Sequence, residues 1–251
     1  MVAFGCLGAI LASFVGVIVA RLYTGQSFLT GHSRCDACDA PLTPLSLVPV
    51  LSFIVSRGRA RCCGARISGL APTSELTLGA LFAFSYGTLG LTLALPFMLV
   101  ALSLLLALVL YDLEHQILPS ILLYAFVATS AVTGFLMSVS VQDFVQTALV
   151  ASLIALSLFA LHAFSRGRAM GFADAPFAFA LALLVGPSAF SGFVYSFWIG
   201  AVVGVALLLR RPKGSRMGVE VPFAPFLACG FLLAYITQWN LFTIIAALSE
   251  H

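Results

Sequence analysis

Two aspartates stand at the ends of long apolar runs, where an ionisable side chain is costly. Asp112 follows the run 94–111, and Asp174 opens the run 174–188. A charged group at membrane depth must be paired or hydrated, so each aspartate is a candidate functional residue. If the carboxyl groups meet, like-charge repulsion favours one ionised and one protonated group, the pair with which aspartic proteases activate water. If they do not meet, both are ordinary helix ends, with Asp174 favoured at a helix N-terminus.

Four of the six cysteines lie in the only extended polar segment, residues 21–73. Cys35 and Cys38 form a C-x-x-C pair, and Cys62 and Cys63 follow about twenty-five residues later. Two short turns at this spacing can bring their thiolates to one tetrahedral zinc ion. Because a reducing cytoplasm argues against disulfides, the segment is interpreted as a zinc-binding knuckle or as a metal-free remnant of one.

The second cysteine pair departs from C-x-x-C because position 60 is Ala60. Adjacent thiols rarely both bind one ion without strain, so Cys63 is the favoured ligand, and either Cys62 or His32 completes the set. The two other cysteines lie in apolar runs and are interpreted as packing residues. The predicted metal ligands are Cys35, Cys38, Cys63 and Cys62.

Small residues and prolines surround Asp174 in the sequence and also open the last apolar run. Gly171 lies shortly before Asp174, and the segment 222–226 opens the last apolar run with two prolines. Proline at a helix start is common, yet here the prolines and Gly171 can also keep the backbone close to Asp174 and leave room for a substrate chain. His115 and His162 are interpreted as interfacial residues rather than ligands.

Charge is scarce in this chain. Of its 251 residues, 61% are hydrophobic and only 8% are charged, against about 45–50% apolar and about 25% charged in soluble domains. Nine acids and twelve bases cannot cover a globule of this size, so most of the surface must face lipid. A net charge of +3 is too small to indicate a nucleic-acid partner.

Eight apolar runs predict the architecture. Each has about the 17–25 residues that a membrane helix needs, although the sixth is short. The expected fold is an all-α integral membrane protein with about eight transmembrane helices and one long cytoplasmic loop that carries the cysteine knuckle. It divides into a first helix at 1–20, the loop at 21–73 and a seven-helix membrane region at 74–251. The runs are 3–20, 74–91, 94–113, 119–138, 144–164, 174–188, 190–209 and 222–238.

The bases distinguish the two faces of the membrane. All twelve lie in three stretches, which follow the first, fifth and seventh runs and therefore fall on one side. The positive-inside rule assigns this side to the cytoplasm, together with the link 114–119 that follows Asp112. Both termini are then predicted to lie outside the cytoplasm. The first run is followed by Arg21 and is predicted to be a retained anchor rather than a cleaved signal.

The order of these motifs resembles the type IV prepilin peptidases, membrane enzymes that remove the leader of type IV pilins and pseudopilins and N-methylate the new terminus. The most specific match is the segment from Asp112 to Pro119, which is close to the family's first catalytic motif, and Gly171 to Asp174 stands where the family has GxGD. The other matches, spread over nearly the whole chain, are Ala12-Ser13-Phe14 with Arg21, Ser33 to Cys38, Val48 to Ser52, Arg57-Gly58-Arg59, Cys63-Gly64-Ala65, Ile67-Ser68 and Val221 to Leu227.

This resemblance implies an aspartic peptidase of the bacterial inner membrane. Asp112 and Asp174 would be its catalytic residues, and its substrate would be a prepilin or pseudopilin whose leader projects into the cytoplasm. The resemblance also implies S-adenosylmethionine as a methyl donor. No segment of the sequence resembles a glycine-rich nucleotide-binding loop that would support binding of this methyl donor. The expectation of methyl transfer therefore rests on the resemblance alone.

Five positions depart from the family pattern. Ala60 replaces the first cysteine of the second knuckle, Ala173 the second glycine of GxGD, and Ala224 the glycine of the last motif. Ser120 replaces an acid, and no lysine follows Asp174. The altered knuckle bears more on zinc and methyl transfer than on cleavage, whereas a methyl group at position 173 could narrow the site or shift Asp174.

Three other classes remain open from the sequence. A catalytically weakened relative could serve as an assembly factor for a pilus or a secretion system. A presenilin-type intramembrane protease would share the acid pair, but the cysteine-bearing segment argues against it. A proton-coupled transporter could also use two membrane acids, yet we find no inverted repeat, and the acids lie near the membrane edge rather than at its midplane.

Overall fold

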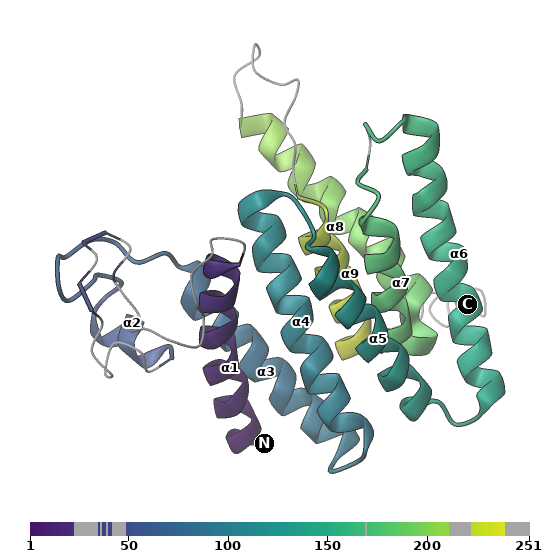
Figure 1. Cartoon of the computed structure of the whole chain (residues 1–251), viewed down its shortest axis with the longest axis horizontal. Helices are drawn as coiled ribbons and strands as arrows, with labels where there is room; N and C mark the ends of the chain where they lie inside the picture. The colour runs from purple at the N-terminus through teal and green to yellow at the C-terminus, as the bar shows by residue number, and fades with distance from the viewer. Residues whose placement is uncertain are drawn as a thin grey trace, which may run out of the picture. The chain divides into compact units, whose positions relative to one another are not determined.

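The computed structural model describes residues 1–22, 35, 37–38, 40–41, 49–168, 170–210 and 222–238. Regular structure in these ranges is helical, apart from isolated β-bridges such as that between Arg59 and Arg66 (Figure 1). The helical class predicted from the apolar runs is confirmed.

Every predicted apolar run overlaps one α-helix in the described ranges, and one short helix, α2, lies in the cysteine-bearing segment. The elements are α1 (Val2–Arg21), α2 (Leu51–Val55), α3 (Leu70–Leu89), α4 (Ala94–His115), α5 (Ser120–Met137), α6 (Val141–Ser165), α7 (Asp174–Val185), the 3-10 turn η2 (Gly186–Ser188), α8 (Ala189–Arg210) and α9 (Ala224–Thr237).

Five stretches of the described chain are long and apolar enough to cross a membrane. Four of them are single helices, whereas the fifth, Asp174–Leu207, combines α7, η2 and most of α8. The turn between α7 and α8 lies where Gly186 and Pro187 predict a break, and Gly186 adopts a φ of +71°. At about 1.5 Å per residue, the 12 residues of α7 are too short to span the apolar core alone. The stretches are Val2–Arg21, Ala94–His115, Ser120–Met137, Val141–Ser165 and Asp174–Leu207.

The chain divides into two compact units, and the first comprises Met1–Leu95. In this unit α1 packs against α3. Glycine permits their close approach, because a Cβ added at Gly8 would lie 2.7 Å from the carbonyl oxygen of Leu78. Close backbone contact through small residues is typical of helices that associate in membranes.

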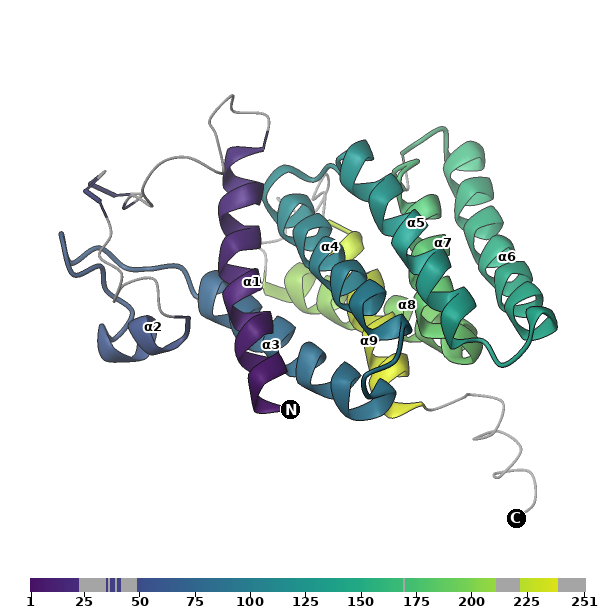
Figure 2. The same ribbon diagram turned by 60° about the horizontal axis from the view of Figure 1, so that its bottom comes forward.

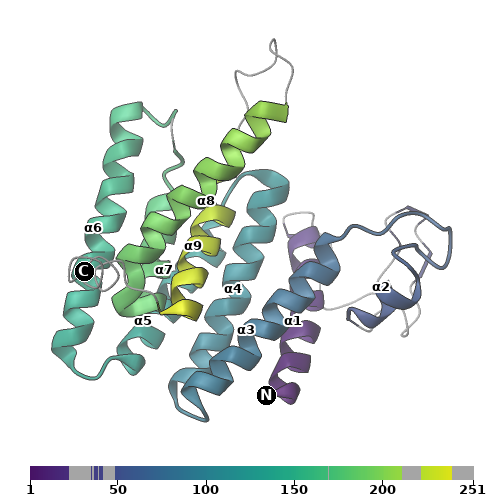
Figure 3. The same ribbon diagram turned by 180° about the vertical axis from the view of Figure 1, so that it is seen from behind.

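The second unit, Pro96–His251, is built around α7. This helix contacts α5, α6, α8 and α9, and Figures 1 and 3 show it among them from opposite sides. Ten of its twelve residues are buried, as expected of a helix that is apolar all round. In the view of Figure 2, α7 lies between α5 and α6. The central helix of the unit is therefore the one that Asp174 begins.

Candidate active site and cysteine cluster

Asp112 lies in the last turn of α4 and is 6% exposed. Its Oδ2 accepts a hydrogen bond of 3.2 Å from the backbone N–H of Ala224. Ala224 is the first residue of α9, and the first amides of a helix have no partner within the helix. The N-terminus of α9, with its partial positive charge, therefore holds a carboxyl group that is far away in the sequence.

Asp174 is the first residue of α7 and is 8% exposed. Its Oδ2 accepts a hydrogen bond of 3.1 Å from the backbone N–H of Gly171. Asp112 and His162 both lie close enough to interact with it electrostatically. The second unit thus brings the two predicted acids near each other, at the end where α4 finishes and α7 and α9 begin (Figures 1 and 3).

Two departures from the family pattern fit this geometry. Ala173 has φ −68° and ψ −18°, an ordinary right-handed conformation that alanine adopts without strain. Ala224 contributes its backbone N–H, a group that glycine would supply equally. Neither departure removes a group that holds an aspartate.

Three partners of the aspartates were not found by reasoning from the sequence. Two are backbone amides: that of Gly171 lies only three residues before Asp174, whereas that of Ala224 meets Asp112 through a tertiary contact. The third is His162, whose Nδ1 lies 2.8 Å from the carbonyl oxygen of Met170, in the loop before Asp174. One histidine in an apolar helix has no spacing pattern that could signal such a contact.

This arrangement can perform general acid–base chemistry. Each carboxyl group is buried, and one of its oxygens is held by a backbone amide, so its orientation is restricted. The second oxygen of each group is free of these amides and can form a hydrogen bond to a water molecule or to a peptide bond. Two neighbouring carboxyl groups that share a proton can activate water and protonate a leaving amine.

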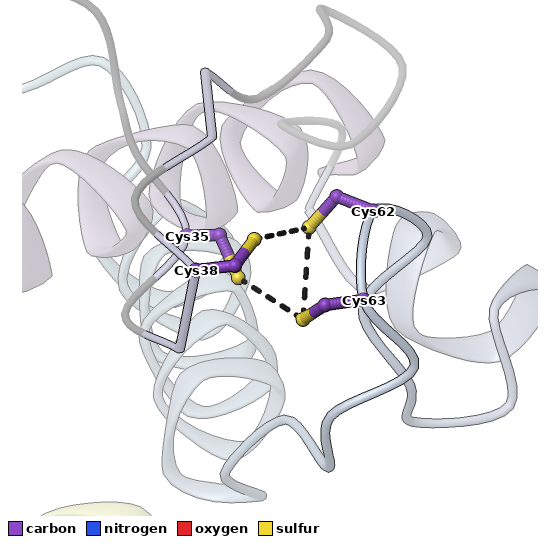
Figure 4. A group of neighbouring side chains, drawn as sticks. All are labelled: Cys35, Cys38, Cys62 and Cys63. Carbon is purple, nitrogen blue, oxygen red and sulfur yellow. Dashed lines mark hydrogen bonds between the residues drawn. The ribbon is translucent and has the colours of Figure 1, made fainter.

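The four predicted thiols lie together in the first unit. Figure 4 shows them directed toward one another from two loops. The sulfur–sulfur distances are 3.3 Å for Cys38–Cys62, 3.8 Å for Cys35–Cys63 and 3.9 Å for Cys62–Cys63. All four ligand atoms lie within 4.8 Å of one another. The alternative ligand His32 lies outside the described residues.

Short turns present the two cysteine pairs. The N–H of Cys35 donates to the carbonyl oxygen of Ala40 at 2.9 Å. On the other side, the N–H of Ala60 donates to Ala65 at 2.8 Å, and Gly64 adopts a φ of +71°. Ala60 thus begins the turn at the position where the family has a cysteine. Cys62, two residues further along this turn, brings its sulfur into the cluster instead.

The donor set fits a tetrahedral zinc ion. Zinc–sulfur bonds of about 2.3 Å place sulfurs about 3.8 Å apart, close to the distances in the cluster. Hydrogen bonds from the backbone N–H groups of Ala37 and Cys38 lower the pKa of the Cys35 thiol to about 7. Contacts with the thiols of Cys38 and Cys35 raise the pKa of Cys62 to about 12. A bound metal would displace that proton, since cysteine coordinates as a thiolate.

Comparisons with known proteins cover both units. Residues 6–89 match the bacterial peptidase A24 N-terminal domain, and residues 99–209 match the type IV leader peptidase family. A prepilin leader peptidase/N-methyltransferase of Bacillus subtilis is 30% identical over 91% of this chain and 91% of its own length. Proteins with the same name from Aeromonas hydrophila and Stutzerimonas stutzeri are 31% and 28% identical, over 86% and 88% of this chain and 76% and 85% of their own lengths.

No solved structure matches the chain significantly. The two family models together cover most of the chain. The second model includes both aspartates, and the first includes all four clustered cysteines. The chain belongs to the type IV leader peptidase family.

Proposed function

We propose that this protein is a membrane aspartic endopeptidase that removes the leader peptide of type IV prepilins or pseudopilins at the cytoplasmic face. The observation that carries the proposal is the pair of buried carboxyl groups at one end of the second unit, each held by a backbone amide. Family membership supplies the substrate class, because the curated relatives are named prepilin leader peptidases.

In the proposed mechanism Asp112 and Asp174 share one proton across a bound water. The ionised carboxylate accepts a proton as the water oxygen attacks the scissile carbonyl carbon, and the protonated partner donates to the carbonyl oxygen. Collapse of the tetrahedral intermediate breaks the carbon–nitrogen bond, and a carboxyl group protonates the leaving amine. The mechanism does not specify which aspartate acts first as the base and which as the acid.

Replacing either aspartate tests this mechanism. Asp112→Asn and Asp174→Asn keep the shape of the side chain and the acceptor oxygen but remove the shared proton. We expect both variants to accumulate in membranes and to leave a prepilin uncleaved. Normal processing by either variant would overturn the proposal. An inactive wild-type protein would favour the alternative of a catalytically weakened assembly factor.

We further propose that S-adenosylmethionine-dependent methylation of the new N-terminus is a second activity of this protein. The support is the name shared by the curated relatives, prepilin leader peptidase/N-methyltransferase. The amine released by cleavage would attack the methyl carbon of S-adenosylmethionine, the sulfur–methyl bond would break to release S-adenosylhomocysteine, and the amine would lose a proton. Methylation should therefore follow cleavage and require added S-adenosylmethionine.

The proposed setting is the bacterial inner membrane, crossed eight times, with lipid around the bundle and both termini outside the cytoplasm. The first helix, residues 1–20, and the region 74–251 would lie in the membrane, and the loop 21–73 would lie in the cytoplasm. The five apolar stretches support membrane insertion, and the basic residues on one side support the orientation. Cleavage would then occur where the substrate helix leaves the bilayer.

We also propose that Cys35, Cys38, Cys62 and Cys63 hold one structural zinc ion in the cytoplasmic loop. Their sulfur–sulfur distances support the proposal. Four thiolates close the coordination shell of zinc, which is typical of structural rather than catalytic sites. The ion would join the two turns and thereby stabilise the loop.

A further inference from the structure

The peptide bond between Met170 and Gly171 is held at both of its polar ends. Its carbonyl oxygen, on Met170, lies 2.8 Å from Nδ1 of His162. Its N–H, on Gly171, donates to Oδ2 of Asp174 at 3.1 Å. Because a peptide unit is planar and rigid, fixing the direction of its carbonyl group also fixes the direction of its N–H. His162 and Asp174 are thus connected through one rigid group.

The chemistry of the partner determines which tautomer His162 adopts. A carbonyl oxygen is only an acceptor, so Nδ1 must carry a proton and donate it. This donation also polarises the peptide unit and makes its N–H a better donor to the carboxyl group, because hydrogen bonds in a chain strengthen one another.

The surroundings of His162 restrict its ring. The ring packs edge-on to Phe172, with centroids 5.9 Å apart and an interplanar angle of 71°. A Cβ at Gly167 would lie 3.3 Å from Cε1 of His162, and Gly167 adopts a φ of +75° that only glycine takes readily. The N–H of Gly167 in turn donates to the carbonyl oxygen of His162 at 2.9 Å. The turn that follows α6 therefore closes around the histidine.

We infer that His162 is a positioning residue for Asp174. It fixes the Met170–Gly171 peptide unit, and the N–H of this unit holds the carboxyl group of Asp174 in the orientation that peptide cleavage requires. The inference rests on the proposed peptidase function, since it assigns a role to a residue that supports one member of the acid pair. The role assigned to His162 is to position Asp174 through this peptide unit, not to transfer the proton itself.

Three variants separate this hydrogen bond from packing. His162→Asn places its side-chain N–H close to the position of Nδ1, so it preserves the donor. His162→Phe keeps a ring beside Phe172 but has no donor, and His162→Gln places its amide nearer the position of Nε2. In membranes supplied with a prepilin, we expect H162F and H162Q to lower kcat for leader cleavage about 10- to 100-fold, the range for loss of an outer partner that orients a functional group. H162N should retain most of the wild-type rate, and KM should change little in all three.

Hydrogen exchange gives a readout that does not depend on cleavage. In the full-length protein, the amide of Gly171 should exchange faster in H162F and H162Q than in wild type and H162N. Arg168→Gln is the matched control in the same loop, because the Nε of Arg168 donates to Ser165 rather than to Met170. This control should match wild type in both exchange and cleavage rate.

The outcomes distinguish this inference from the proposed function. Equal cleavage and equal exchange in H162F and wild type would overturn the positioning role, as would equal losses in H162F and H162N. If H162F fails to accumulate, H162Q takes its place, and equal cleavage and exchange in H162Q and H162N would overturn the positioning role. A wild-type protein that never cleaves prepilin would overturn the proposed function, and the exchange data would still test the contact between His162 and the loop.

Discussion

At the scale of single residues, backbone groups hold the two candidate catalytic side chains. Oδ2 of Asp112 is bound by the N–H of Ala224, and Oδ2 of Asp174 by that of Gly171. A backbone donor tolerates a change of the side chain that carries it, and this accounts for alanine where the family has glycine at position 224. At position 173, alanine fits because the backbone there has an ordinary right-handed conformation.

Restoring the family glycines tests this explanation. We expect Ala173→Gly and Ala224→Gly to cleave prepilin at rates comparable to wild type, because glycine adopts the conformation of Ala173 equally well and supplies the same amide at position 224. The Ala224→Gly protein should lose up to about 1 kcal/mol of stability, the usual cost of glycine in a helix. Initial cleavage rates and thermal unfolding in detergent are the measurements. A large gain in rate for A173G would show instead that the methyl group displaces Asp174.

The cysteine cluster provides a second test at this scale. Cys62→Ser should remove one thiolate and lower the zinc content of the purified protein, as measured by mass spectrometry of the metal. Adding Ala60→Cys to Cys62→Ser moves the fourth thiol to the family position and should restore zinc. Cys6 lies in the same unit but outside the cluster. The Cys6→Ser variant is therefore the control and should keep full zinc content.

Zinc in the Cys62→Ser protein equal to that of wild type would contradict the assignment of this residue as a ligand. Removing the metal with a strong chelator should destabilise the loop, because binding energy at a structural zinc site contributes to folding. Faster proteolysis of the chelated protein within residues 21–73 is the expected result.

At the scale of elements, close contacts of glycine with a neighbouring backbone set the position of α7. A Cβ added at Gly134 of α5 would lie only 2.7 Å from the carbonyl oxygen of Leu183 in α7. Backbone cannot move aside as a flexible side chain can, so α5 and α7 depend on this glycine to pack closely.

Gly134→Ala should therefore lower the free energy of unfolding by about 1–3 kcal/mol. Gly204→Ala in α8 is the matched control, because nothing lies within 4 Å of a Cβ added there. Thermal unfolding of both variants in detergent measures the difference. Equal melting temperatures for the two variants would show that α5 and α7 are not packed as described.

Much of this architecture is predictable from composition, because long apolar runs between charged stretches dictate membrane helices. The short α7 and the turn after it follow from Gly186 and Pro187. Details at helix ends follow less directly: α3 begins at Leu70 rather than at 74, with the Leu70 N–H bound by Oγ of Ser68. Pro72 does not prevent this, since a helix tolerates proline in its first turn.

The site is predictable only in part. The cost of burying a charge makes Asp112 and Asp174 candidate functional residues, and spacing predicts that the two cysteine pairs form one cluster. The amide of Ala224 reaches Asp112 only because α4 and α9 pack together, and the contact of His162 with Met170 depends on the conformation of the turn after α6. No local pattern encodes such contacts, so only the tertiary structure reveals them.

At the scale of the whole molecule, the positions of the basic residues predict how the protein is oriented in the membrane. The chain has only twelve bases, and Arg166 and Arg168 follow α6 at the same end of the second unit as Asp174. Positive residues are retained on the cytoplasmic side of a membrane, so the acid pair should face the cytoplasm.

Reporter fusions test this orientation. Alkaline phosphatase, which folds only outside the cytoplasm, should be active when fused after Val139, between α5 and α6, and inactive when fused after Arg168. Comparable expression of the two fusions is the control. The reverse pattern would place the candidate active site on the opposite face and exclude cleavage from the cytoplasm.

The most direct test of the central claim is mass spectrometry of a prepilin incubated with the protein in lipid vesicles, with and without S-adenosylmethionine. We predict loss of the leader under both conditions and a methylated new N-terminus only when the methyl donor is present. Asp174→Asn protein in the same vesicles should leave the substrate unchanged. An intact prepilin after incubation with the folded wild-type protein, or leader loss that persists in the Asp174→Asn protein, would contradict the account.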